Sequence, residues 1–184
     1  MDLSKSIEAL RQGKTILYPT DTIWGIGCDA TNANACNKII EIKNRPKDKS
    51  FIILMDGFPM LERYIHEFHE VCYDLVDLAT EPLTIIYPKA NGLAPSAVAN
   101  DGSVGIRITK DPICLQLIRG LRKPLLSTSA NISGKKISET FHDIDASIKS
   151  GVDAIVSERL DEKMTTPSKL LKIGLSGEIT IIRK

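Results

Sequence analysis

The chain has 184 residues, of which 42% are hydrophobic and 26% charged, a composition typical of a folded globular protein and not of collagen, a coiled coil or a disordered chain. The balance of 24 Lys and Arg against 23 Asp and Glu leaves a net charge of +1, so bulk charge does not indicate a protein that coats a polyanion. No apolar run approaches the ~18 residues of a membrane span, and the charged N-terminus has no secretion signal. We therefore expect a single domain over residues 1–184, located in the cytoplasm.

Helix-type and strand-type hydrophobic spacing alternate along the chain. Helical spacing of Leu3, Ile7 and Leu10 comes first, and the apolar run 15–18 that follows ends at Pro19, where a loop must begin. The pattern then predicts a helix at 33–43, a strand at 51–55, helical structure around 59–79, strands around 83–88 and 103–109, a helix around 112–121, a strand at 125–128, a helix near 138–148, and strands near 153–156, 168–173 and 178–183. This interleaving indicates an α/β fold with a sheet covered by helices.

The cysteines give no sign of a metal or disulfide framework. Cys28, Cys36, Cys72 and Cys114 contain no Cys-x-x-Cys pair. We expect them to be reduced and mostly buried.

A first polar segment, Tyr18–Asp29, begins where the first strand ends. It combines hydroxyl side chains with Gly25 and Gly27, and strand ends of open α/β sheets commonly carry ligands. Thr, Asp and Gly are also ordinary turn residues, so spacing alone favours a structural turn. The two glycines lack the third glycine of a dinucleotide motif, and the chain has no P-loop.

A second polar segment, Lys43–Ser50, follows a predicted helix and is rich in cations. A short loop stiffened by Pro46 suits phosphate binding, because Arg can bind two phosphate oxygens while Lys supplies a mobile charge. The alternative is a solvated charged surface. The rigidity of proline favours a binding site.

Two further segments place polar groups on apolar strands. The segment Lys123–Gly134 opens from an apolar strand into hydroxyls, an amide and a glycine, which could contact phosphate or form a turn or helix cap. In the other segment, Ser103–Arg107, an arginine stands within an otherwise apolar strand. A buried arginine must find an anion, either from the protein or from a ligand.

Taken together and in this order, the segments resemble the YrdC-like family of threonylcarbamoyl-AMP synthases, of the short, single-domain type. The resemblance rests on Tyr18–Thr22, Lys43–Pro46, Ser129–Asn131 and the pair Pro167 and Ser168. It implies a twisted mixed sheet with a large basic cavity. It also implies a nucleotidyltransferase that converts L-threonine, bicarbonate or CO2 and ATP to threonylcarbamoyl-adenylate and pyrophosphate.

The resemblance also implies roles for particular residues. L-Threonine would be held by Thr22, Ser103, Arg107, Ser127 and Ser168, with Arg107 pairing the carboxylate. The ATP phosphates, carrying Mg2+, would meet Lys43, Arg45, Lys49, Ser129 and Asn131, and of these Lys43, Arg45, Ser129 and Asn131 would form the catalytic set. Partner proteins would transfer the product to tRNA.

Two alternatives stay open: a module that binds double-stranded RNA or tRNA, and a paralogue that handles another carbamoyl-adenylate. The regions 38–49 and 107–123 contain no aromatic side chain, so they offer no platform for base stacking. The chain also departs from the family pattern, with Ala79–Pro82 in place of a Trp-Pro-Gly-Pro turn and Leu54 where some members have histidine.

Overall fold

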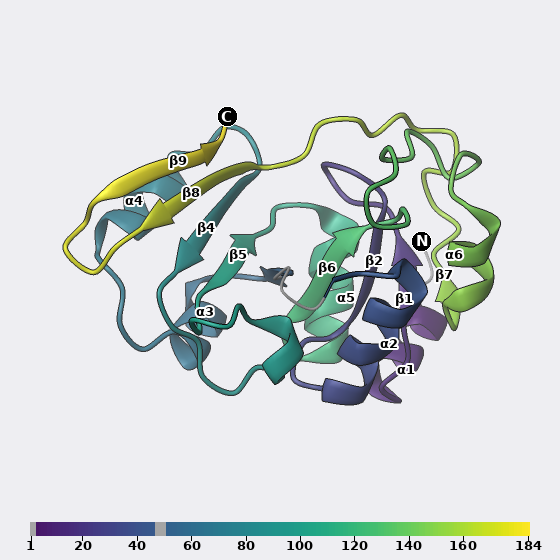
Figure 1. The fold of residues 1–184 in the computed structure, drawn as a ribbon, viewed down its shortest axis with the longest axis horizontal. Coiled ribbons are helices and arrows are strands. Elements are labelled where there is room, and N and C mark those ends of the chain that lie inside the picture. Colours follow the sequence, from purple (N-terminus) through teal and green to yellow (C-terminus); the bar gives the residue numbers. More distant parts are fainter. Residues whose placement is uncertain (1–2, 47–50) are drawn as a thin grey trace.

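The computed structural model describes residues 3–46 and 51–184. Within these residues, nine strands form one sheet in the order β7-β1-β2-β6-β3-β5-β4-β8-β9 (Figure 1). The strands are β1 Ile16–Tyr18, β2 Gly25–Asp29, β3 Ile52–Met55, β4 Leu83–Tyr87, β5 Val104–Ile108, β6 Leu125–Ser129, β7 Ala154–Ile155, β8 Lys169–Ile173 and β9 Ile179–Arg183. The pairs β1/β7, β3/β5 and β4/β8 are parallel, and the other neighbours are antiparallel.

Helices flank this mixed sheet, so the expected α/β architecture is confirmed. They are α1 Ser4–Arg11, α2 Ala33–Lys43, α3 Phe58–Tyr64, α4 Val71–Asp77, α5 Pro112–Leu121 and α6 Ala146–Gly151, with a 3-10 turn, η1, at Pro95–Ala97. Local sequence sets where they begin: the Asn32 side chain accepts from the Ala35 amide, and Asp111 accepts from the Cys114 amide. No helix in the described part of the chain is long and apolar enough to cross a membrane.

The central strands have two different faces, because successive side chains of a strand point to opposite sides. On one face Leu126, Ile53 and Ile106 are at most 2% exposed and belong to the same hydrophobic core as Leu117 and Ile118 of α5. The intervening residues of β6, β3 and β5 therefore lie on the other face. Polar residues of β6 and β5 occur on that face.

The strand β2 was not anticipated from the sequence, where Gly25 and Gly27 suggested a loop. In the structure both glycines lie in a strand between β1 and β6. A Cβ at Gly27 would lie 2.6 Å from the carbonyl oxygen of Leu126 and 2.8 Å from Cε1 of Tyr18. Gly27 is therefore required by the close approach of the Tyr18 ring and the neighbouring strand.

Two helix predictions were also wrong in extent. The helical region expected around 59–79 is divided into α3 and α4, and the helix expected near 138–148 begins only at Ala146. The irregular segment before α6 is held by side chain to backbone bonds, for example from the Ser138 hydroxyl to the Ala130 carbonyl and from the Thr140 amide to Asp143. Such bonds compete with helix formation.

The cysteine prediction is confirmed: all four cysteines are free and buried. Burial raises the pKa of the Cys114 thiol, which keeps it protonated.

We predict that Gly27→Ala destabilises the protein by ~1–3 kcal/mol, because the added methyl group would clash with backbone that cannot move cheaply. Gly57→Ala is the matched control, since its Cβ would make only an ordinary 3.6 Å contact with Cδ of Pro59. Urea denaturation measures both free energies of unfolding. Equal losses in the two variants would contradict the packing argument.

Candidate active site

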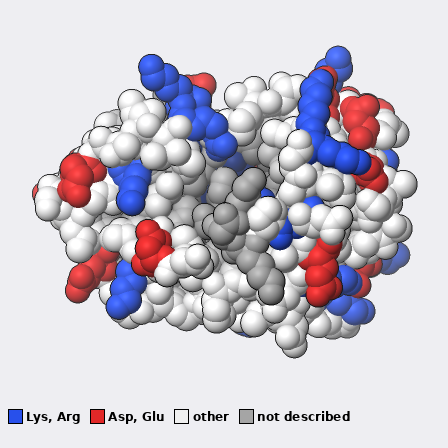
Figure 2. Space-filling view, in the orientation of Figure 1, with Lys and Arg blue, Asp and Glu red and all other residues white. Residues whose placement is uncertain are grey.

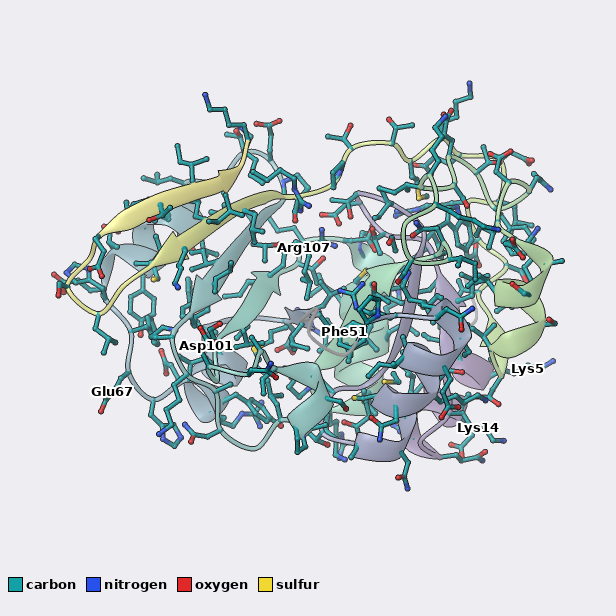
Figure 3. The ribbon with its side chains drawn as sticks, in the orientation of Figure 1. Lys5, Lys14, Phe51, Glu67, Asp101 and Arg107 are labelled. Atoms are coloured by element: carbon teal, nitrogen blue, oxygen red, sulfur yellow. The ribbon has the colours of Figure 1, made fainter. Side chains whose placement is uncertain are left out.

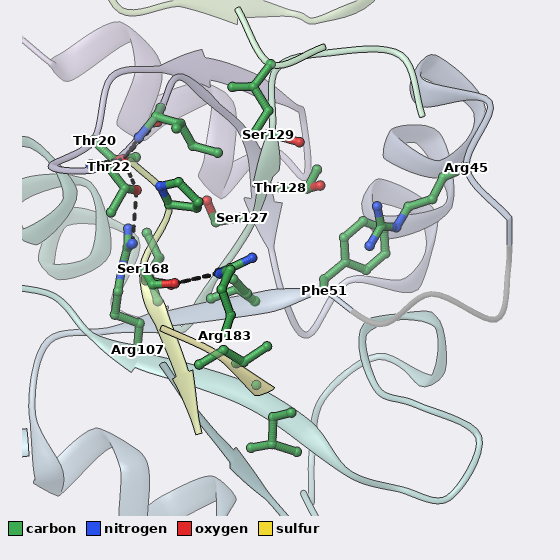
Figure 4. Close-up of a pocket in the computed structure, with 18 residues that line it drawn as sticks. Thr20, Thr22, Arg45, Phe51, Arg107, Ser127, Thr128, Ser129, Ser168 and Arg183 are labelled. Carbon is green, nitrogen blue, oxygen red and sulfur yellow. Dashed lines mark hydrogen bonds between the residues drawn. The ribbon is translucent and has the colours of Figure 1, made fainter. Parts of the chain in front are cut away.

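The floor of a cavity is formed by the face of the central strands that lies opposite the hydrophobic core. Strand register aligns Ser127, Ile52, Gly105 and Ile86 in one row across β6, β3, β5 and β4. All four line a cavity of about 320 Å³, which we call the site cavity (Figure 4). Leu54 and Arg107 form the next row of the floor, two residues further along β3 and β5. The volume is within the range of small-molecule sites.

Loops, the end of β6 and the strands β8 and β9 complete the walls of the site cavity. The residues that they contribute are Thr20, Thr22, Ile23, Arg45, Phe51, Thr128, Ser129, Ile137, Pro167, Ser168, Leu170 and Arg183. Figure 2 shows the surface hollowed near the centre of this face, with basic side chains bordering the hollow. Phe51 and Arg107 lie near the middle of the molecule, whereas Lys5, Lys14 and Glu67 lie toward its periphery (Figure 3).

Arg107 is the most enclosed cation of the site cavity, with 4% exposure. Its Nη1 donates to Oγ1 of Thr22 at 3.0 Å, and its Nη2 lies 3.2 Å from Oδ1 of Asp21. Thr22 is itself fixed, because its hydroxyl shares a 2.8 Å hydrogen bond with that of Thr20. The anion expected beside a buried arginine is thus Asp21. The Nε of Arg107 has no hydrogen-bond partner among the described residues.

Two hydroxyl groups of the cavity lining, those of Ser127 and Ser168, are held by hydroxyls of neighbouring strands. The Tyr18 hydroxyl donates to Oγ of Ser127 at 2.7 Å, and burial raises the pKa of Tyr18, which keeps the phenol a donor. The Ser168 hydroxyl lies 2.8 Å from that of Thr84. Nε of Arg183 donates to the Ser168 carbonyl at 2.8 Å. This bond joins β9 to the residue that precedes β8, and both residues line the cavity.

Arg45 reaches the site cavity from the end of α2. The chain turns there because Asn44, the residue that ends the helix, adopts a left-handed conformation with φ of 48°. The Arg45 guanidinium lies over the Phe51 ring, 4.7 Å from its centroid. Arg45 and Ser129 therefore line one cavity, as the sequence hypothesis requires. Lys49, also predicted to meet phosphate, lies outside the described residues.

Lys43 is buried with 1% exposure and does not line the site cavity. Its Nζ donates to the carbonyl oxygens of Ser129 and Asn131, and its own carbonyl accepts from the Ser133 amide at 3.0 Å. Lys43 thus ties the end of α2 to the last residue of β6 and to the segment that follows it. Burial, together with the charge of Arg45, lowers the pKa of Lys43 to about 7.

Two other predicted residues also lie outside the cavity lining. Ser103 precedes β5, and its hydroxyl donates to Asp101 at 2.6 Å. The Asn131 side chain donates to the carbonyl of Lys135 at 2.7 Å, while its Oδ1 is buried and has no hydrogen-bond partner in the described part of the chain. Of the predicted residues, the structure brings together Thr22, Arg45, Arg107, Ser127, Ser129 and Ser168.

Sequence reasoning missed Arg183, Thr20 and Ile137, which also line the site cavity. Arg183 carried a usable signal, because it is an arginine within an apolar strand, as Arg107 is. Ile137 carried none, because it lies in an irregular segment whose path depends on tertiary contacts.

The low pKa of Lys43 predicts a specific pH dependence of stability. Between pH 7 and the ordinary lysine pKa, Lys43 carries a proton in the unfolded chain but not in the folded one. The free energy of unfolding therefore rises with pH in this range, by up to ~1.4 kcal/mol per pH unit. Lys43→Met removes this dependence, whereas Lys14→Met, at an exposed position, preserves it. Denaturation from pH 7 to 10 measures the slopes. Parallel curves for wild type and Lys43→Met would contradict the prediction.

Comparison with known proteins finds relatives in sequence and in fold. A threonylcarbamoyl-AMP synthase from Vibrio cholerae serotype O1 is 31% identical over 159 residues, which cover 84% of each chain. The structure of P. abyssi Sua5 complexed with L-threonine is similar with a TM-score of 0.80 and 28% identity, covering 92% of this chain and 50% of that one. E. coli YciO, at 22% identity, shares the fold with a TM-score of 0.80 over 98% of this chain and 87% of its own.

The chain spans about half the length of the P. abyssi Sua5 chain that it matches. It also matches the family described as Telomere recombination over residues 8–184. The chain belongs to this family, the Sua5/YciO/YrdC family.

Proposed function

We propose that the protein is a threonylcarbamoyl-AMP synthase, which forms threonylcarbamoyl-adenylate and pyrophosphate from L-threonine, bicarbonate or CO2, and ATP. The observation that carries the proposal is that one cavity holds arginines at separate positions. Arg107 lies among hydroxyl groups on the sheet floor, and Arg45 lies in the wall with Ser129. A carboxylate and a phosphate chain need such separate cationic contacts.

Arg107 is the proposed partner of the threonine carboxylate. Its planar guanidinium suits a carboxylate, and it has donors beyond those used by Asp21 and Thr22. The hydroxyls of Thr22, Ser127 and Ser168 line the same cavity and are suited to the amine and hydroxyl of threonine. A role for Ser103 in threonine binding stays a prediction.

Arg45, Arg183 and Ser129 are the proposed contacts of the ATP phosphates. The described lining contains arginines at 45, 107 and 183 and no carboxylate, so it favours anionic ligands. Direct phosphate contacts by Lys43, Lys49 and Asn131 stay predictions. Mg2+ would enter with the substrate ATP, and the lining offers it hydroxyl oxygens in addition to the phosphate oxygens and water.

The chemistry that this arrangement supports has two steps. The neutral threonine amine attacks CO2 and loses a proton to give the carbamate. A carbamate oxygen then attacks the α-phosphorus of ATP in line, and the bond to pyrophosphate breaks. The protein contributes mainly by positioning the two substrates and by stabilising negative charge on the phosphates. Partner proteins would use the adenylate to modify tRNA.

We predict that pyrophosphate release from ATP requires both threonine and bicarbonate. Arg45→Ala should lower kcat/KM roughly 100-fold or more, because a fixed cation at the phosphates is lost. Arg183→Ala should have the same direction of effect. A coupled pyrophosphate assay, with each substrate omitted in turn, measures these rates.

Arg119→Ala is the control, since the Arg119 side chain is 65% exposed and pairs with Asp56 at 4.0 Å, outside the site cavity. Its rate should equal that of the wild type. Pyrophosphate release without threonine would refute the proposed reaction. Salt-sensitive binding of tRNA in the absence of any pyrophosphate release would favour the nucleic-acid module instead.

A further inference from the structure

The ion pair between Asp21 and Arg107 has no assigned role in the reaction. Asp21 Oδ1 lies 3.2 Å from Nη2 of Arg107, and the Asp21 side chain is 27% exposed. Thr22, the next residue, accepts from Nη1 of the same guanidinium. Two consecutive residues of the β1–β2 loop therefore hold the two terminal nitrogens of one arginine.

Asp21 approaches Arg107 from outside the site cavity. A second cavity of about 250 Å³, which we call the rear cavity, is lined by Asp21 and Arg107 together with residues 79–83, which lead into β4. Arg107 lines both cavities, whereas Asp21 lines only the rear one. The guanidinium thus lies in the wall between the two cavities. Asp21 can hold it there without occupying the space of a ligand.

The Asp21–Arg107 ion pair supplies negative charge beside a cavity whose described lining is cationic. Burial and the charge of Arg107 lower the pKa of Arg183, so the two arginines repel each other. The described lining holds no Asp or Glu that could offset this repulsion. Among the ion pairs of the described residues, Asp21 pairs with Arg107, and none involves Arg183. Without Asp21, Arg107 would keep a buried charge with no anionic partner until a ligand arrived.

We propose that Asp21 is a positioning residue: it fixes the Arg107 guanidinium from the rear cavity so that the remaining donors face a substrate carboxylate. This inference rests on the proposed function, because it takes that substrate to be the amino acid. Holding Arg107 in place before binding lowers the conformational entropy that binding would otherwise cost, since an arginine side chain has many rotamers.

The test compares L-threonine with L-threoninamide, which lacks the carboxylate charge. Isothermal titration calorimetry measures both affinities in the wild type, Asp21→Asn and Asp21→Glu. We expect the wild type to prefer threonine, and Asp21→Asn to weaken threonine binding about tenfold while leaving threoninamide binding nearly unchanged. Asp21→Glu, which restores a carboxylate, should recover most of the threonine affinity. The KM for ATP should change less than the KM for threonine.

Asp56→Asn is the matched control. Asp56 also has a side chain that is 27% exposed and also pairs with an arginine, Arg119, but it does not line either cavity. Its threonine affinity should equal that of the wild type. Thermal melting of each variant shows whether it is folded.

The outcomes separate this inference from the proposed function. Tighter threonine binding by Asp21→Asn would show that Asp21 competes with the substrate, and would overturn the inference. Equal losses for threonine and threoninamide would also overturn it, because a general loss of structure does not distinguish the two ligands. A wild type that binds neither ligand would overturn the proposed function together with the inference.

Discussion

A buried guanidinium on the open face of the sheet is the constraint on which the site depends. Arg107 is fixed in the middle of the molecule by its strand, because β5 lies between β3 and β4 and its neighbouring residue Ile106 is part of the core. A cation so enclosed requires anionic or polar partners. The β1–β2 loop supplies them as Asp21 and Thr22. The position of that loop therefore follows from the charge of Arg107.

The rest of the cavity is arranged around the same sheet face. The glycine strand β2 lets the Tyr18 ring and β6 approach closely, and Tyr18 in turn fixes the Ser127 hydroxyl. On the side of the cavity that contains Ser129, the Lys43 ammonium donates to the carbonyl oxygens of Ser129 and Asn131. These bonds keep Ser129 close to the end of α2, where Arg45 follows. The contacts around Arg107 and Ser127 and the contacts around Arg45 and Ser129 are therefore built by different elements. Both groups lie over the same floor of the site cavity. This division suits a reaction between two substrates.

Most of the fold was predictable from hydrophobic spacing, and the failures have physical causes. The periodicity of α2 and α5 and the apolar strands β5 and β6 identified these elements correctly. Strand β2 was missed because its glycines are required by contacts with Tyr18 and Leu126, which are remote in sequence. The late start of α6 reflects bonds such as Thr140 to Asp143, which no periodicity reveals. The order of the motifs made Thr22, Arg45 and Arg107 candidates, and all three line the site cavity, whereas the enclosed position of Lys43 depends on tertiary packing that the sequence does not reveal.

The central claim is that an amino-acid carboxylate and a nucleotide phosphate meet in one cavity. A crystal structure with L-threonine and a non-hydrolysable ATP analogue tests it most directly. The account predicts the threonine carboxylate on Arg107 and the phosphates near Arg45 and Arg183, with the threonine nitrogen directed toward the α-phosphate. Threonine bound away from Arg107, or a nucleotide bound outside the site cavity, would contradict the account.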